Sequence, residues 1–203
     1  MNYGDLKSHF NDLLNRSDIT AALTTRFIDQ GIARVQRQLR TPMSERVLNV
    51  TITGQTASLT LPSDFLETIS LYKDEFEIER VSMRKFRQDA NTAVEGKPRI
   101  FVRQAEKLLL HPQPTSGTLT LYYHGEFPAL SADSDENVLT QAAPDVVLYA
   151  ALSFAADYYL DQRAEIFETK FQQFLLELQE QANDQELQGG TQSVLPAYTF
   201  QDE

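Results

Sequence analysis

The chain of 203 residues contains no cysteine, and histidine occurs only three times. Without cysteine the protein has no disulfide, no zinc–thiolate site and no thiol nucleophile. No apolar run approaches the ~18 residues that a membrane-spanning helix requires. The first residues, Met1-Asn2-Tyr3-Gly4-Asp5, also lack the basic and apolar segments of a signal peptide. These absences predict a protein that is made in the cytosol and has no contact with a membrane.

Positive charge is scarce as well. The chain has 18 lysines and arginines against 29 aspartates and glutamates, which gives a net charge of −11. Unselective attraction to DNA depends on basic residues that neutralise phosphates, so this composition argues against it. From residue 126 onward only Arg163 and Lys170 are basic, whereas arginines are frequent near the N-terminus. This uneven distribution of basic residues has two interpretations. Either each end of the chain has a solvated charged face, or the two ends are oppositely charged parts of a docking surface through which identical subunits pack head to tail.

Sequence motifs of catalysis and metal binding are absent. The three histidines are His9, His111 and His124. They lack metal-ligand spacing, and the chain has no nucleophile elbow, phosphate-binding loop or dinucleotide-binding glycine motif. Asp133, Asp135 and Glu136 lie close together but lack the spacing of a calcium loop, so a solvated loop is the favoured interpretation. The sequence therefore predicts no enzyme, no metal and no cofactor.

Helical periodicity marks both ends of the chain. Residues 3–15 predict a short helix, and Ser17 or Asp18 is expected to cap a longer helix that stops at Thr41-Pro42. A third helix is predicted from Pro144 to about residue 160, and a fourth from residue 163 to 187. The fourth carries a seam of apolar residues at steps of three and four, which are Phe167, Phe171, Phe174, Leu178 and Ala182. Such a seam is typical of core or bundle packing.

Between the helices the pattern changes to β structure. Residues 47–52 and 57–61 predict two strands that pair across a turn at residues 53–56. Further β segments are expected at residues 69–72, 76–81, 98–102, 107–110 and 118–123, the last with strict period-two alternation. Ser82 is expected to cap a short helix that ends at Ala90, and residues 129–136 predict a polar, acidic loop.

The predicted architecture is an α+β fold in four parts. Residues 1–44 and 131–187 supply the helices of a bundle, residues 45–130 form an inserted antiparallel β-rich lobe, and residues 188–203 form an extended tail. The tail has apolar residues that suit strand addition or groove docking on another chain, which are Val194, Leu195, Tyr198 and Phe200. The alternative is that the tail folds back over the chain's own helices.

An ordered set of short motifs resembles one known family. The set begins with Arg37-Gln38-Leu39-Arg40, Leu61-Pro62-Ser63-Asp64-Phe65 and Gly96-Lys97-Pro98. It continues with Leu108-Leu109-Leu110-His111-Pro112-Gln113-Pro114, Leu119-Thr120-Leu121-Tyr122-Tyr123, Phe127-Pro128-Ala129-Leu130-Ser131 and Pro144-Asp145-Val146-Val147-Leu148-Tyr149-Ala150. Each motif alone is common, but together, over about residues 3–185, they are similar to the head–tail adaptor (connector) proteins of tailed bacteriophages.

The resemblance implies a structural ring protein of the virion that is assembled in the host cytoplasm. Such a ring would be a dodecamer that joins the portal protein to a tail component, with double-stranded DNA passing through its lumen without specific binding. Arg34, Arg37 and Arg40 lie at helical spacing and are predicted to contact acidic groups of a neighbouring subunit or of the portal; a solvated face is the alternative. Two rival functions are a cytosolic interaction protein that binds a partner helix or peptide without forming a ring, and a hydrolase that uses carboxylates and a metal.

Overall fold

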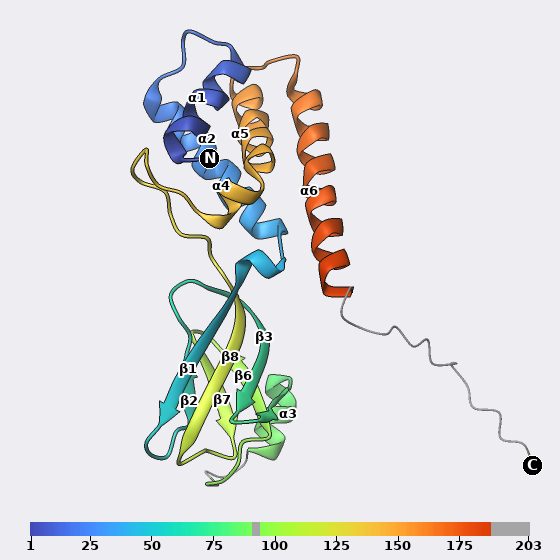
Figure 1. The fold of residues 1–203 in the computed structure, drawn as a ribbon. Coiled ribbons are helices and arrows are strands. Elements are labelled where there is room, and N and C mark those ends of the chain that lie inside the picture. Colours follow the sequence, from blue (N-terminus) through green and yellow to red (C-terminus); the bar gives the residue numbers. More distant parts are fainter. Residues whose placement is uncertain (91–93, 188–203) are drawn as a thin grey trace, which may run out of the picture. The chain divides into compact units, whose positions relative to one another are not determined.

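The computed structural model describes residues 1–90 and 94–187, and it confirms the predicted α+β class (Figure 1). The chain divides into two compact units. The first comprises residues 1–8 and 42–144, and the second comprises residues 9–41 together with the chain from residue 145 onward. The helix α1 (Tyr3–Leu14) contributes residues to both units.

The first unit is built on two four-stranded sheets (Figure 1). One sheet has the order β1-β8-β3-β4, and the other has the order β2-β7-β6-β5. The strands are β1 (Glu45–Ile52), β2 (Ser58–Thr60), β3 (Phe65–Lys73), β4 (Phe76–Glu77), β5 (Glu79–Arg80), β6 (Ile100–Gln104), β7 (Lys107–His111) and β8 (Gly117–Gly125). All named pairs are antiparallel except β5 with β6, which is parallel.

A single apolar core joins the two sheets. Its buried members on the first sheet include Ile52, Leu71 and Leu121, and those on the second include Leu59 and Leu108. Period-two alternation places these side chains on the inner faces, so the sheets pack face to face as a sandwich. The outer face of the second sheet is covered by the helix α3 (Met83–Asp89), because Phe86 packs with Val102 of β6.

The N-terminal residues are held by the acidic segment that the sequence predicted as a loop. The backbone amides of Tyr3 and Gly4 donate to the carbonyl oxygens of Asp135 and Asp133, both at 2.9 Å. Immediately afterwards comes an unexpected short helix, α4 (Val138–Ala142), whose cap Asn137 forms a capping box with Thr140. This segment is therefore part of the first unit's structure and holds the start of α1.

The second unit consists of helices. They are α2 (Ala21–Gln38), α5 (Pro144–Tyr158) and α6 (Ala164–Leu187), together with the second half of α1. The helix α5 is buried over much of its circumference by small and aliphatic residues, as expected for a central helix. On α6, Phe167, Phe171 and Ala182 are buried as the seam predicts, and the ring centroids of Phe174 and Tyr149 of α5 lie 5.4 Å apart.

Several predicted boundaries and pairings are wrong for identifiable reasons. The helix α2 is capped by Thr20, whose hydroxyl accepts from the amide of Leu23, while Asp18 instead binds Arg16. The strands β1 and β2 do not form a hairpin, because each pairs in a different sheet and the turn between them connects the two layers. The predicted strand at residues 76–81 divides at the buried Ile78 into β4 and β5, which also belong to different sheets.

The packing of α2 on α5 generates a stability prediction. A Cβ atom placed on Gly31 would lie 2.9 Å from the backbone nitrogen of Ala151 and 3.0 Å from the carbonyl oxygen of Val147. Gly31→Val therefore separates the helices and is expected to lower the free energy of unfolding by about 1–3 kcal/mol. Chemical denaturation measures this, with the exposed Ala33→Val on the same helix as the matched control. Equal stability of the two variants would contradict close packing at Gly31.

Candidate docking surfaces

The three arginines expected to contact a neighbour occupy different environments. Arg34 lies within α2 with only 16% of its side chain exposed. Arg37 lies in the last turn of α2 and is exposed. Arg40 follows the end of the helix and is also exposed. The three arginines thus have helical spacing, but Arg34 is largely buried whereas Arg37 and Arg40 are exposed. The three guanidinium groups therefore do not share one function at the surface.

Arg34 connects three helices of its own unit. Its Nη1 and Nη2 atoms donate to the two carboxylate oxygens of Glu168 on α6, at 2.8 and 2.5 Å, and Nη1 also donates to Ser153 on α5 at 2.9 Å. The guanidinium carbon lies 4.1 Å from the ring centroid of Phe171. The hydrogen bonds from Arg34 hold the pKa of Glu168 below its usual value. The role of Arg34 within the chain is therefore to fix α2 against α5 and α6.

Arg37 and Arg40 remain candidates for contacts with another chain. Nη1 of Arg40 donates to the carbonyl oxygens of Gln36 and Leu39, both at 2.8 Å, so this side chain is partly directed toward the helix end. Arg37 projects from the last turn of α2, where a positive charge also favours the helix dipole. Their contact with an acidic neighbour stays a prediction.

A second candidate surface is the turn between α5 and α6. The amide of Leu160 donates to the carbonyl of Asp157 at 3.2 Å, and that of Asp161 donates to Ala156 at 2.8 Å. These two bonds form a Schellman motif, in which the residue at the Leu160 position adopts a left-handed conformation and is usually glycine. Leu160 has a φ of 52° and is 89% exposed, so its side chain compensates none of this strain by packing within the unit.

The turn is held rigidly by a charged pair at its base. Nη2 of Arg163 donates to Asp161 at 2.7 Å and to the carbonyl of Leu14, at the end of α1, at 2.8 Å. The hydrogen bonds from Arg163 lower the pKa of Asp161 to about 2. This pair therefore stabilises the fold fully above the ordinary pKa of 3.8, and the contribution is lost as the pH falls through about 2.

Tyr158, which precedes this turn, is 61% exposed, and its ring centroid lies 5.7 Å from that of Phe27. Sequence analysis missed Tyr158 and Leu160 as candidates, because it expected the third helix to continue to residue 160. The sequence did contain one signal of a strained turn. The chain reverses direction between residues 158 and 163, yet it has no glycine or asparagine there to adopt the left-handed conformation.

Three of the residues considered as ligands, Asp133, Asp135 and His124, have partners within the chain. Oδ2 of Asp135 accepts from the amides of Ser131 and Ala132 at 2.8 Å, which lowers its pKa, and Asp133 forms an ion pair with Lys7. Nδ1 of His124 lies 2.8 Å from the hydroxyl of Ser44. No group of three or more potential metal ligands occurs within residues 1–90 and 94–187.

The predicted tail contacts, Val194, Leu195, Tyr198 and Phe200, lie outside the described residues. Within the described part of the chain, no helix combines the length and apolar character needed to cross a bilayer.

Comparison with known families decides the kind of protein that carries these surfaces. The family model described as SU10 adaptor protein matches residues 1–194. The chain belongs to the SU10 adaptor protein family. A search of curated proteins finds no match.

The SU10 adaptor assignment confirms the resemblance to phage head–tail adaptors. An SU10 adaptor is a structural component of the virion that associates with the portal and tail components, and it belongs to a family that is not typically enzymatic. The match also continues beyond residue 185, where the resemblance from short motifs ended, and it includes Val194 of the tail. The functional surfaces of this SU10 adaptor are therefore surfaces for other proteins.

The strained turn of the SU10 adaptor generates a second prediction. Leu160→Gly removes the penalty of a left-handed leucine, about 1–2 kcal/mol, at an entropic cost of about 0.5–1 kcal/mol. The variant is expected to unfold at a higher denaturant concentration than the parent chain. Leu160→Ala is the matched control, because it removes the side chain but keeps the Cβ atom that causes the strain. An equal gain for both variants would mean that exposure, and not the backbone, is responsible.

Proposed function

We propose that this adaptor forms a homo-oligomeric ring of twelve copies that joins the portal to a tail component and continues the DNA channel. The family match over residues 1–194 carries the proposal, because it spans both units and leaves little of the chain for another function. A ring needs two different surfaces on each subunit, so that every copy contacts the next in the same way and the assembly closes.

Exposed apolar residues on the helical unit support a subunit that binds other proteins. Large apolar side chains are exposed on α5, on α6 and in the turn between them, and they are Tyr158, Leu160, Ile166 and Leu176. The strain at Leu160 is consistent with a contact to another chain, since its exposed side chain adds no packing within the unit that would offset the strain. Rigid apolar anchors of this kind commonly contribute most of the affinity of an interface.

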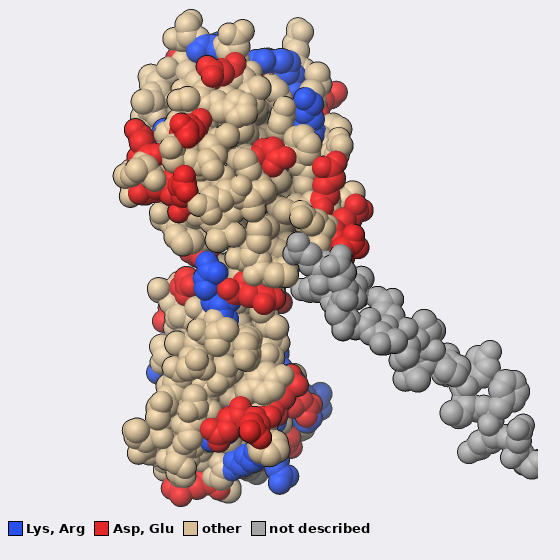
Figure 2. Space-filling model, in the orientation of Figure 1, with Lys and Arg blue, Asp and Glu red and all other residues tan. Residues whose placement is uncertain are grey.

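The charge of the chain supports passage of DNA without binding. Acidic side chains gather along α6 (Figure 2), which carries Glu165, Glu168, Glu177, Glu180 and Asp184. Repeated around a channel, a subunit with a net charge of −11 repels phosphates, so the genome slides through the lumen. The tail residues Val194, Leu195, Tyr198 and Phe200 are proposed to dock on the portal or on an adjacent subunit.

Portal-dependent assembly tests the proposal. The purified chain is expected to be a monomer or small oligomer alone and to form rings when the portal protein encoded near it in the genome is added. The reason is that a ring that assembled without the portal would form before the head is filled with DNA. Negative-stain microscopy and mass measurement with and without portal separate these states. A chain that fails to associate with portal at micromolar concentration would contradict the proposal, as would a chain that binds portal only as a single copy.

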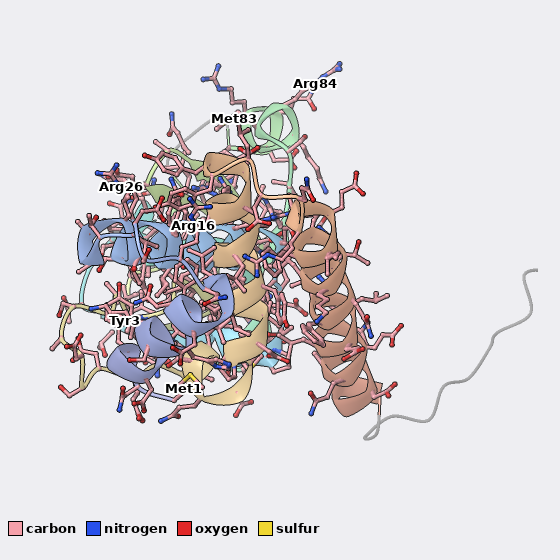
Figure 3. The ribbon with its side chains drawn as sticks, turned by 90° about the horizontal axis from the view of Figure 1, so that it is seen from above. Met1, Tyr3, Arg16, Arg26, Met83 and Arg84 are labelled. Atoms are coloured by element: carbon pink, nitrogen blue, oxygen red, sulfur yellow. The ribbon has the colours of Figure 1, made fainter. Side chains whose placement is uncertain are left out.

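A charge-reversal variant tests the contact made by the end of α2. Arg37→Glu is expected to weaken portal-dependent assembly about fivefold at low salt, and less at high salt, because one exposed charge contact contributes up to ~1 kcal/mol. Arg26→Glu is the control with the same change of net charge, since Arg26 is exposed on the N-terminal half of the same helix (Figure 3). Equal assembly by both variants would favour a solvated face at Arg37.

A further inference from the structure

We propose that the free edge of β1 receives residues 191–200 of a second copy of the chain as an added strand. This inference rests on the ring proposed above and names one contact between its subunits. Three observations support it, which are the length of the edge, the groove beside it and the alternating pattern of the C-terminal segment.

The strand β1 is the longest edge strand without a register shift among the described residues. It pairs with β8 over all eight residues, from Glu45 with His124 to Ile52 with Gly117, with no register shift. Its other side carries no strand, because β1 is the first strand of its sheet. The edge strands β4, β2 and β5 are short, with two, three and two residues. The outer side of β3 is covered by β4 only at Tyr72 and Lys73, but two register shifts interrupt that edge.

The edge of β1 also lacks the usual protection against strand addition. Shortness, bulges, proline and lysine are the common devices that blunt an edge. The strand has no proline or lysine, and its only charged residues, Glu45 and Arg46, stand at its start. A regular edge of this length is therefore suited to bind an extended segment through its backbone.

A groove beside the edge leads to the core of the sandwich. It has a volume of about 480 Å³ and is lined by the last three residues of β1, the connecting turn at residues 53–56 and the strand β2. Three core residues, Ile52, Leu59 and Leu119, contribute to its wall. Leu48 and Val50 pack against the same core but are only partly buried. Apolar side chains from an added strand would cover the surface of Leu48 and Val50 that is still exposed.

The C-terminal segment has the pattern that such a site requires. Val194, Pro196, Tyr198 and Phe200 stand at every second position, so a strand places all four on one face. Proline is tolerated in an added edge strand, because only one side of that strand needs its backbone donors. At ~3.3 Å per residue, residues 188–203 span roughly 50 Å when extended, which is enough to reach a neighbouring subunit.

The partner is inferred to be a second copy because every chain carries both surfaces of the contact. Each chain carries one donor segment and one acceptor edge, and they are different surfaces, so a contact between copies is heterologous. In a closed ring every edge is filled and every segment is used. Strand addition would also explain why apolar side chains occur in a C-terminal segment that the helical pattern does not include.

Photo-crosslinking in the full-length chain tests the inference. Phe200 is replaced by p-benzoylphenylalanine, and heavy-isotope and unlabelled copies are mixed before rings are assembled with portal protein. The crosslinks are expected to join labelled to unlabelled chains, at residues 45–60. Crosslinks to portal, or crosslinks within one chain, would overturn the inference while rings still form. If no ring forms, the proposed function fails first and the inference fails with it.

A matched pair of variants separates the edge from the sheet face. Thr51 of β1 and Thr118 of β8 are direct partners on the same face, but only Thr51 lies on the edge strand. Thr51→Lys is expected to reduce the yield of crosslinks between copies several-fold, because lysine disfavours strand addition at an edge. Thr118→Lys is expected to leave the yield unchanged. An equal loss in both variants would show that the segment docks on the face, and would overturn the edge assignment.

Discussion

The antiparallel pairing of β1 with β8 is the constraint on which the rest of the first unit depends. These strands are the first and last of the β-rich segment, and their register brings Glu45 opposite His124. The chain therefore enters and leaves the sandwich at neighbouring positions. Because the ends meet, residues 45–125 form the sandwich as one continuous segment of the chain. The same pairing makes β8 a central strand and leaves β1 at the edge.

Charged residues in the helical unit serve two different purposes. Arg34 and Arg163 donate to groups of their own chain, and each one connects elements distant in sequence. Partly buried pairs of this kind fix geometry more than they add stability, since desolvation offsets much of the attraction. Arg37, in contrast, is exposed at the end of α2. A basic cluster in the sequence thus separates into Arg34, which orders the unit, and the exposed Arg37, which remains a candidate for contact with another chain.

Rigidity makes the exposed apolar turn suited to the binding role proposed for it. The Schellman bonds and the Asp161–Arg163 pair fix the backbone on both sides of Leu160. A side chain that is held in place before binding loses little entropy when a partner covers it. The backbone strain at this turn is tolerated because Arg163 holds the turn through Asp161 and the carbonyl oxygen of Leu14.

The sequence by itself determined the α+β class, the helices at both ends, the phage adaptor resemblance and most of the strands. These features follow from local periodicity, caps and turn residues such as Ser82, which act over a few neighbouring positions. Only the tertiary structure decided that β1 and β2 lie in different sheets, because the pairing of distant strands depends on which faces share a core. It also decided that Arg34 binds Glu168, which stands 134 residues later in the chain. Helical spacing places a side chain on its own helix but contains no information about the helix that will lie opposite it.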